Sequence, residues 1–334
     1  MSVRARSLCL EHRGAYRSVC ARLPEMPKSS GLIDMIGNSA KASVTVTVAI
    51  LGLAACATPP PAEIETVAQS GIKFAESVSP LLNDALDGAI ASNSDTLIMA
   101  HANASADARK TALLEANGAY QERAKIFADV GDHAQLLKTY FVTLMALGDT
   151  SGDSAIGTEA ETLVNQMGAL DESIAKYEIG GRSVASIPGA VTPPVVAEFR
   201  SAVVERELRE HGDDIVKAIE LQRSFLQAVG DDLQSELAAE QQEQAFKNVI
   251  EPYVSNDPLP SDWKALRASA LADGQTQSVA ALSAAAATAE NLKISFIAMA
   301  EGNGSAGLFS QLENDVDRLV ALVTAITGAA PVAS

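Results

Sequence analysis

Apolar residues recur at steps of three and four along the chain from about residue 62 onward. Between Ser154 and Glu178 they follow a heptad spacing, with Ile156, Ala160, Leu163, Met167, Leu170, Ile174 and Tyr177 at alternating steps of four and three. This spacing puts the apolar side chains on one face of an α-helix, whereas a half-buried strand would alternate with period two. No stretch of more than a few residues alternates in that way. The pattern therefore predicts an all-α fold.

Similar apolar seams predict the other helices. They cover 62–92, 104–149, a segment from Pro193 to about 229 or, with a bend at Gly230, to 252, a segment beginning at Ser261, and a last helix containing Phe309 and Ile326. Heptad seams favour packing at about +20°. We therefore expect residues 62–328 to form an elongated antiparallel helical bundle of about five to seven helices. The Gly- and Pro-rich segment at 179–193 is the best candidate for a boundary within it.

A short internal similarity relates the two parts of the bundle. Residues 134–141 and 289–296 match at four positions, and each segment is followed by Met-Ala and a turn that contains Gly. Duplication of a helical half explains the match, and so does chance similarity between helices rich in Ala and Leu. Two related halves and a single bundle therefore both remain open at this point.

The N-terminal region has the order of an export signal. Lys41 precedes the apolar run 42–52, which is shorter than the roughly 20 residues that span a bilayer. A cleaved signal peptide fits this run better than a membrane helix. Residues 1–34 make the region before the signal unusually long, so we interpret them as an over-extended start or a dispensable leader, with Met26 or Met35 as the true start.

The sequence Leu53-Ala54-Ala55-Cys56 resembles the lipobox of bacterial lipoproteins. This resemblance implies cleavage between Ala55 and Cys56, a diacylglyceryl group on the Cys56 sulfur and acylation of the new amino group. It also implies sorting to the periplasmic face of the outer membrane, because residue 57 is Ala and not the Asp of inner-membrane retention. Residues 1–55 would then be leader and signal peptide, and residues 56–61 the lipidated Cys with a Pro-rich spacer.

The mature chain would be strongly acidic. Residues 1–55 hold seven of the 25 basic residues and three of the 42 acidic ones, so their removal leaves 18 basic and 39 acidic residues and a net charge of −21. Such a surface disfavours nucleic acid and favours a basic protein partner. Cys9 and Cys20 leave with the leader and Cys56 is used for lipid, so no cysteine remains for a disulfide.

Two polar residues interrupt the apolar seam of the helix after Pro193. His211 and Gln222 share that seam with Val204, Leu208, Ile215, Ala218, Phe225 and Val229. Polar residues on a core seam fix the register of packed helices or line an internal polar pocket. His211 and Gln222 are therefore the candidate polar core site.

The mature chain shows no sequence motif for catalysis. Its histidines are His101, His133 and His211, and neither His133 nor His211 lies in a Glu-x-x-His motif of a di-iron bundle. No nucleophile motif or phosphate loop is present. We therefore expect no enzyme activity, no cofactor and no metal. The leading hypothesis is a non-enzymatic helical interaction or assembly module, and the alternative is a small-ligand-binding or sensor bundle with a pocket near His211 and Gln222.

Overall fold

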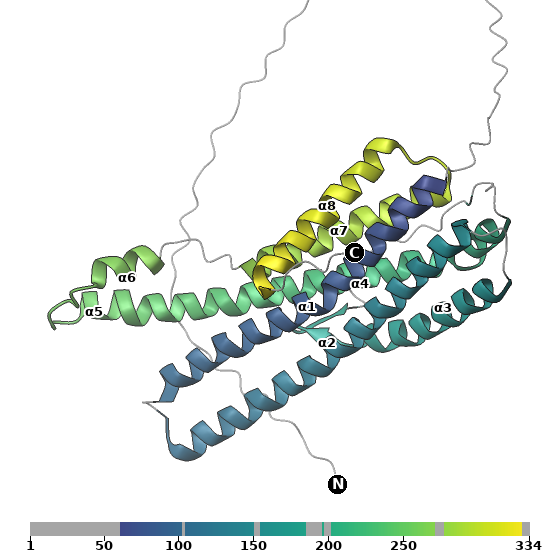
Figure 1. The fold of residues 1–334 in the computed structure, drawn as a ribbon. Helices are drawn as coiled ribbons and strands as arrows, with labels where there is room; N and C mark the ends of the chain where they lie inside the picture. Colours follow the sequence, from purple (N-terminus) through teal and green to yellow (C-terminus); the bar gives the residue numbers. More distant parts are fainter. Residues whose placement is uncertain are drawn as a thin grey trace, which may run out of the picture. The chain divides into compact units, whose positions relative to one another are not determined.

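The computed structural model describes residues 61–101, 104–149, 154–184, 196, 202–270 and 277–328. Within these ranges the chain is an all-α helical bundle, as predicted (Figure 1). The elements in chain order are α1 (Pro61–His101), α2 (Ala106–Asp149), α3 (Ser154–Ile174), β1 (Glu178–Ile179), β2 (Arg182–Ser183), α4 (Ala202–Ala245), the π-helical turn η2 (Phe246–Ile250), α5 (Glu251–Val254), α6 (Trp263–Ala270), α7 (Gln277–Ala300) and α8 (Ala306–Thr327). The leader, Ala55 and Cys56 lie outside the described residues.

The predicted seams form the core. On α1, α7 and α8 the seam residues are buried, with only Ile326 partly exposed. A single apolar cluster contains residues from both sides of the segment 179–193. None of the helices in the described ranges combines the length and the hydrophobicity that a bilayer-spanning segment requires.

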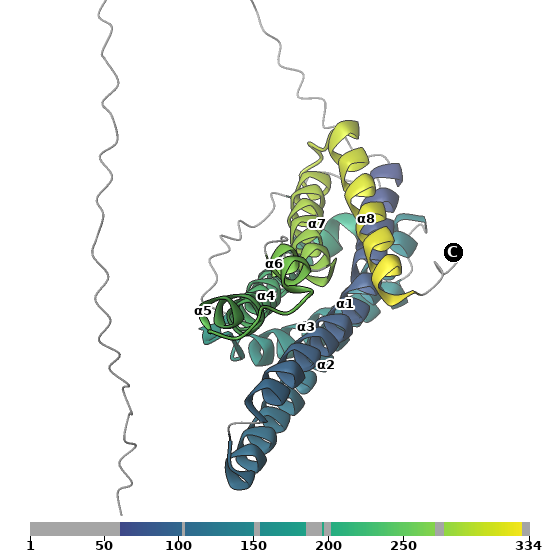
Figure 2. The ribbon, with the colours of Figure 1, turned by 90° about the vertical axis from the view of Figure 1, so that its left-hand side faces the viewer.

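Three of the packed helix pairs run in opposite directions: α1 with α2, α2 with α4, and α4 with α7. α1 packs on α2, α2 on α3 and α4, and α4 on α7, while α7 and α8 both pack on α1 (Figures 1 and 2). In each antiparallel pair the residue numbers rise on one helix as they fall on the other. The contacts that show this are Gly71 with Phe141 and Ser79 with Gly131 for α1 and α2, Arg123 with Asp232 and Phe127 with Phe225 for α2 and α4, and Glu220 with Lys293 and Gly230 with Leu282 for α4 and α7.

Close approach of α1 and α2 depends on Gly71. The ring of Phe141 lies over this glycine so closely that a Cβ atom there would be 2.3 Å from the ring. Phe141 also makes an edge-to-face contact with Phe296 on α7, with ring centroids 6.3 Å apart. One aromatic side chain thus joins three helices in the core.

The connection from α7 to α8 follows the predicted Gly-containing turn. Gly302 has a φ of 64°, its N–H donates to the carbonyl of Met299, and the N–H of Asn303 donates to that of Ala298. This pattern is a Schellman motif, which ends a helix by satisfying its last carbonyls. Ser305 then caps α8 by accepting a hydrogen bond from the N–H of Leu308 at 3.2 Å.

The structure differs from the sequence interpretation at two places. α1 continues to His101 instead of ending near Ser92, and the Ser94 hydroxyl donates to the carbonyl of Ile90 in the same helix. α4 continues through Gly230 to Ala245, as the longer of the two predicted helices does. β1 and β2 form a two-stranded ribbon, although the sequence predicted no sheet. Gly180 and Gly181 both have positive φ, as a tight hairpin turn requires, and strands of two residues are too short for a period-two pattern.

Candidate functional site

The most deeply buried polar group lies where α2, α3 and α4 meet. His133 on α2 and Gln222 on α4 are 0% and 1% exposed, and Asp171 on α3 is partly exposed. Nδ1 of His133 is 2.7 Å from Nε2 of Gln222, and its Nε2 is 2.8 Å from Oδ1 of Asp171. A single imidazole therefore contacts polar groups on two neighbouring helices.

The contacts of Gln222 assign the tautomer of this imidazole. The Gln222 amide nitrogen donates to the backbone carbonyl of Val130 at 3.1 Å and to Nδ1 of His133. An amide nitrogen donates but does not accept, so Nδ1 is the acceptor and the proton of neutral His133 is on Nε2. Nε2 then faces the Asp171 carboxylate, which is close enough for a contact but not turned into a well-aligned hydrogen bond.

Nδ1 of His133 accepts a hydrogen bond from α4, and its Nε2 lies against the Asp171 carboxylate on α3. A second contact between α2 and the segment after α3 lies near this site, where the Tyr177 hydroxyl donates a hydrogen bond to the carboxylate of Asp129. That hydrogen bond raises the pKa of Tyr177. The contacts of His133 with Asp171 and of Asp129 with Tyr177 hold α3 and the segment after it against α2. These residues therefore position the two elements.

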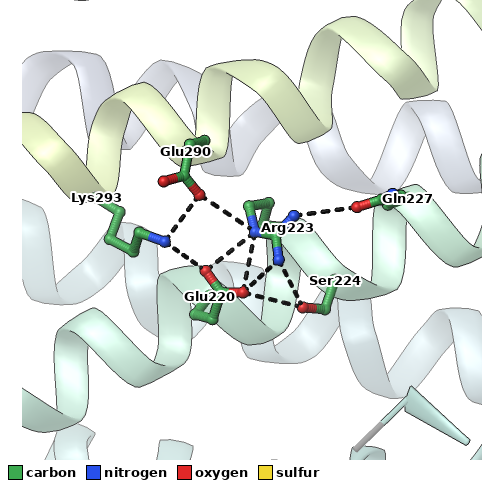
Figure 3. Close-up of polar contacts among 6 residues, drawn as sticks. All are labelled: Glu220, Arg223, Ser224, Gln227, Glu290 and Lys293. Carbon is green, nitrogen blue, oxygen red and sulfur yellow. Dashed lines mark hydrogen bonds and ion pairs between the residues drawn. The ribbon is translucent and has the colours of Figure 1, made fainter. Parts of the chain in front are cut away.

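A cluster of four charged side chains joins α4 to α7 (Figure 3). Nζ of Lys293 lies 2.7 Å from Oε2 of Glu220 and 2.8 Å from Oε2 of Glu290. Nε of Arg223 lies 3.0 Å from both carboxylate oxygens of Glu220 and 3.3 Å from Oε2 of Glu290. Each cation therefore contacts both carboxylates, and the cluster carries no net charge.

The pairing decides the protonation of the cluster. Burial would raise the pKa of Glu220, but hydrogen bonds from Arg223 and Lys293 outweigh it and hold that pKa below the usual value. Burial would lower the pKa of Lys293, but its hydrogen bonds to Glu220 and Glu290 raise it. Glu220, Arg223 and Lys293 therefore stay ionised near neutral pH.

A groove of about 530 Å³ adjoins this cluster between α4 and α7. Its walls are Arg223, Leu226, Gln227, Gly230, Asp231, Gln234, Val279, Ala280, Ser283, Ala286, Ala287 and Glu290. The small side chains come from an Ala-rich run of α7, whose lack of bulk lets a neighbouring helix come close. α4 does pack there, and a Cβ on Gly230 would lie 3.4 Å from that of Leu282.

A third polar site is a buried carboxylate that forms no ion pair among the described residues. Glu207 on α4 is 4% exposed, and its Oε1 has no hydrogen-bond partner among the described residues. Burial, aided by the charge of Glu210, raises the pKa of Glu207 to about 7, against an opposing effect of Arg206. Burial and the charge of Glu207 also raise the pKa of the fully buried Tyr140 well above its usual value.

Within the described ranges, no three His, Cys, Asp or Glu side chains converge in a way that could hold a metal ion. The charged cluster is paired internally, and the imidazole contacts polar groups on α3 and α4. Their chemistry is that of fixed contacts between helices.

Fold and site together define an all-α bundle with an internal polar core and an ion cluster between helices. No family model, curated protein or solved structure matches this chain.

The structure does not bring the two predicted core residues together. Gln222 is buried, but His211 is only partly buried and lies eleven positions earlier on α4, about 16 Å along the helix axis. The polar partner of Gln222 is His133. The predicted lipidation and cleavage positions, Cys56 and Ala55, lie outside the described residues.

Two sets of residues were missed by sequence reasoning, although each had a signal. His133 lies four residues before Leu137 and three after Val130, so it shares their buried face. Glu220 with Arg223 and Glu290 with Lys293 are both opposite-charge pairs at a spacing of three. That two such pairs face each other depends on the packing of α4 on α7, which sequence spacing does not specify.

Proposed function

We propose that this chain is a lipoprotein, anchored through Cys56 to the periplasmic face of the outer membrane, and that its helical body is a non-enzymatic interaction or assembly module. The export signal and the lipobox support the anchor. α1 begins at Pro61, only five residues after Cys56, so the helical body would start close to the lipid. α1 then extends about 60 Å, at 1.5 Å for each of its 41 residues.

The observation that carries the module hypothesis is the placement of exposed apolar side chains. Within the described ranges, the large exposed apolar residues are, apart from Val142 and Ile294, Ile90, Ile98, Leu113, Leu114, Phe246, Ile250, Tyr253, Val254 and Leu259. The first four lie on α1 and α2, near the connection between these helices. The other five lie just after the end of α4. Because α2 and α4 run antiparallel, both groups belong to the end of the bundle away from Pro61.

The α1–α2 connection has a groove at this end, which we call the hairpin groove. It has a volume of about 480 Å³, and its lining is Leu97, Ile98, Ala100, His101, Ala104, Ala108, Arg109, Ala112 and Leu113. Exposed apolar surface in a mature chain with an expected net charge of −21 is characteristic of a contact surface for another macromolecule. A partner would then bind at the end remote from the lipid.

A small-ligand-binding function is the second candidate, and the groove between α4 and α7 supports it. Its volume of about 530 Å³ is within the range of small-molecule sites. It replaces the pocket expected beside Gln222, whose amide nitrogen is engaged by Val130 and His133. Substituting Ala287→Phe would fill the groove without touching either apolar group.

Two experiments test the proposal. Mass spectrometry of the protein from membranes of its native host should find a mature N-terminus at a triacylated Cys56, and Cys56→Ser should release the chain from the membrane. An unmodified Cys56 with a retained leader would contradict the anchor. Photo-crosslinking side chains at Ile98 and Val254 should then capture one defined protein, while matched positions Val142 and Ile294 should not.

The second candidate gives the opposite pattern. If Ala287→Phe abolishes the cellular function and the apolar positions give no crosslink, the ligand-binding interpretation replaces the interaction module. If Ala287→Phe has no effect and the crosslinks at Ile98 or Val254 persist, the module stands.

A further inference from the structure

A long segment of the bundle has no buried residue. From Gln234 to Ala270, which we call the arm, every residue is exposed or only partly exposed, although most of the arm is helical. The arm comprises the last turns of α4, then η2, α5 and α6 (Figure 1). Helices draw most of their stability from an apolar face packed on a neighbour. The arm therefore has an apolar face that the described bundle does not cover.

The arm is nevertheless held in a definite shape. The Trp263 indole donates to the carbonyl of Val249 at 2.9 Å, and its ring stacks on Tyr253 with centroids 5.4 Å apart. The guanidinium of Arg267 lies over the same indole. These contacts fold α6 back against η2, and π-helical turns of this kind are frequent at functional sites.

Five large apolar side chains of the arm are exposed to solvent. Tyr253 is 65% exposed and Val254 is 72% exposed, and Phe246, Ile250 and Leu259 are each about half exposed. They follow one another over η2, α5 and the turn after it. A partner that covers them would bury aromatic and aliphatic surface together, as the centres of protein interfaces do.

Carboxylates surround this apolar surface. The arm has six acidic residues and three basic ones. Lys247 pairs with Glu243 on its own helix, and Arg267 lies over Trp263. Glu251, Asp257 and Asp262 are exposed beside the apolar residues. Exposed apolar residues and exposed carboxylates therefore alternate along this part of the arm, where Lys264 is also exposed.

We propose that the arm docks a basic, amphipathic helix of a partner protein. The apolar face of such a helix covers Ile250, Tyr253 and Val254, while its Lys and Arg residues face Glu251 and Asp257. A second copy of this chain is disfavoured because two acidic arms would repel each other. An anionic lipid surface is disfavoured for the same reason.

This inference rests on the proposed interaction module and names one of its surfaces. The mature chain with Cys56→Ser, which needs no lipid, is the material for the test. Trp263 is the only tryptophan in the protein, so its fluorescence reports from the arm alone. The probe is a synthetic peptide of about 18 Leu and Lys residues, long enough for five helical turns, with Leu at helical spacing. Peptides with the same composition in scrambled order, and with Glu in place of Lys, are the controls.

The Leu/Lys peptide should shift the Trp263 emission to shorter wavelength in a saturable titration. Ile250→Ser combined with Val254→Ser should weaken this binding by about tenfold or more, because apolar contact area is lost. The matched pair Val142→Ser with Ile294→Ser removes equally apolar exposed residues from the body of the bundle, and should change nothing. The double variant Glu251→Gln with Asp257→Asn should weaken binding and reduce its salt dependence. Glu172 and Glu313 are exposed carboxylates outside the arm, so the double variant Glu172→Gln with Glu313→Gln should leave both properties unchanged.

Equal binding of the Leu/Lys peptide by all these variants would overturn the proposal, as would equal binding of the scrambled or Glu-containing peptide. Vesicles that contain phosphatidylglycerol should leave the emission unchanged, and a blue shift with them would identify a lipid surface as the occupant instead. Failure here combined with a protein crosslink at Ile98 would leave the interaction module intact and assign it to the hairpin groove. Failure at both surfaces would remove the module itself.

Discussion

Lys293 on α7 lies 2.7 Å from Glu220 on α4, and both side chains are nearly buried. Their contact is the only one in the cluster of Figure 3 that joins two side chains each at most 10% exposed on different helices. Burying a carboxylate costs several kcal/mol unless it is paired. The ion cluster therefore adds little net stability. Its main effect is on the alignment of α4 and α7, because Lys293 and Glu220 are paired in only one alignment.

Replacing Lys293→Met should destabilise the fold by roughly 1–3 kcal/mol, because Glu220 keeps Arg223 but loses its second cation. The measurement is urea unfolding of the Cys56→Ser chain. The control is Lys217→Met, which breaks an exposed pair with Asp214 on one helix and should cost less than about 0.5 kcal/mol. Equal losses in the two variants would show that the cluster does not constrain the α4–α7 contact.

Gly71→Ala should also destabilise the protein, by about 1–3 kcal/mol, because its Cβ would overlap the Phe141 ring. Gly118→Ala is the matched control, since a Cβ there meets nothing within 4 Å. It should stabilise α2 by roughly 0.5–1 kcal/mol through higher helix propensity. Adding Phe141→Leu should reduce the cost of Gly71→Ala, and a cost that stays the same would contradict the steric explanation.

The buried carboxylate of Glu207 makes stability depend on pH. Its folded pKa of about 7 lies above the unfolded value near 4.5, so the folded state binds more protons between these values. The contribution of Glu207 to stability is therefore greatest below pH 4.5 and is lost as the pH rises to about 7. A raised pKa of this size corresponds to roughly 2–3 kcal/mol.

Glu207→Gln should remove this component. As the pH rises from 5 to 8, the unfolding free energy of the variant should increase relative to that of the parent chain by up to about 3 kcal/mol. Urea unfolding of both proteins measures this difference. The exposed Glu159→Gln should run parallel to the parent chain over the same range. A Glu207→Gln variant that also runs parallel would show that this carboxyl group is not the one that titrates.

The bundle was predictable because its information is local and repeated. Each seam on α1, α7 and α8 records which face of one helix is buried, so spacing within the sequence was sufficient. The partner of Gln222 was not predictable in the same way. The seam identified Gln222 as a polar core residue, but the meeting with His133 depends on the offset between α2 and α4, which no single seam contains.

The arm shows a second feature that sequence periodicity does not predict. Its residues 234–254 have helical composition, and the longer of the two helices that the sequence predicted after Pro193 extends to residue 252. Periodicity identifies an apolar face but not whether the chain itself covers it. Only the structure shows that Ile250, Tyr253 and Val254 stay exposed although the Trp263 indole holds α6 against η2.

The contact between Gln222 and His133 separates the two residues that the sequence grouped together. Gln222→Leu should cost roughly 2–4 kcal/mol, because it leaves the Val130 carbonyl and Nδ1 of His133 buried without a donor. His211→Leu, on the same seam but only partly buried, should change the unfolding free energy by less than about 1 kcal/mol. The double variant Gln222→Leu with His133→Phe should recover part of the loss, because no unpaired imidazole remains. If His211→Leu proved as costly as Gln222→Leu, the two residues would form one polar site after all, and the assignment of His133 as the partner would be wrong.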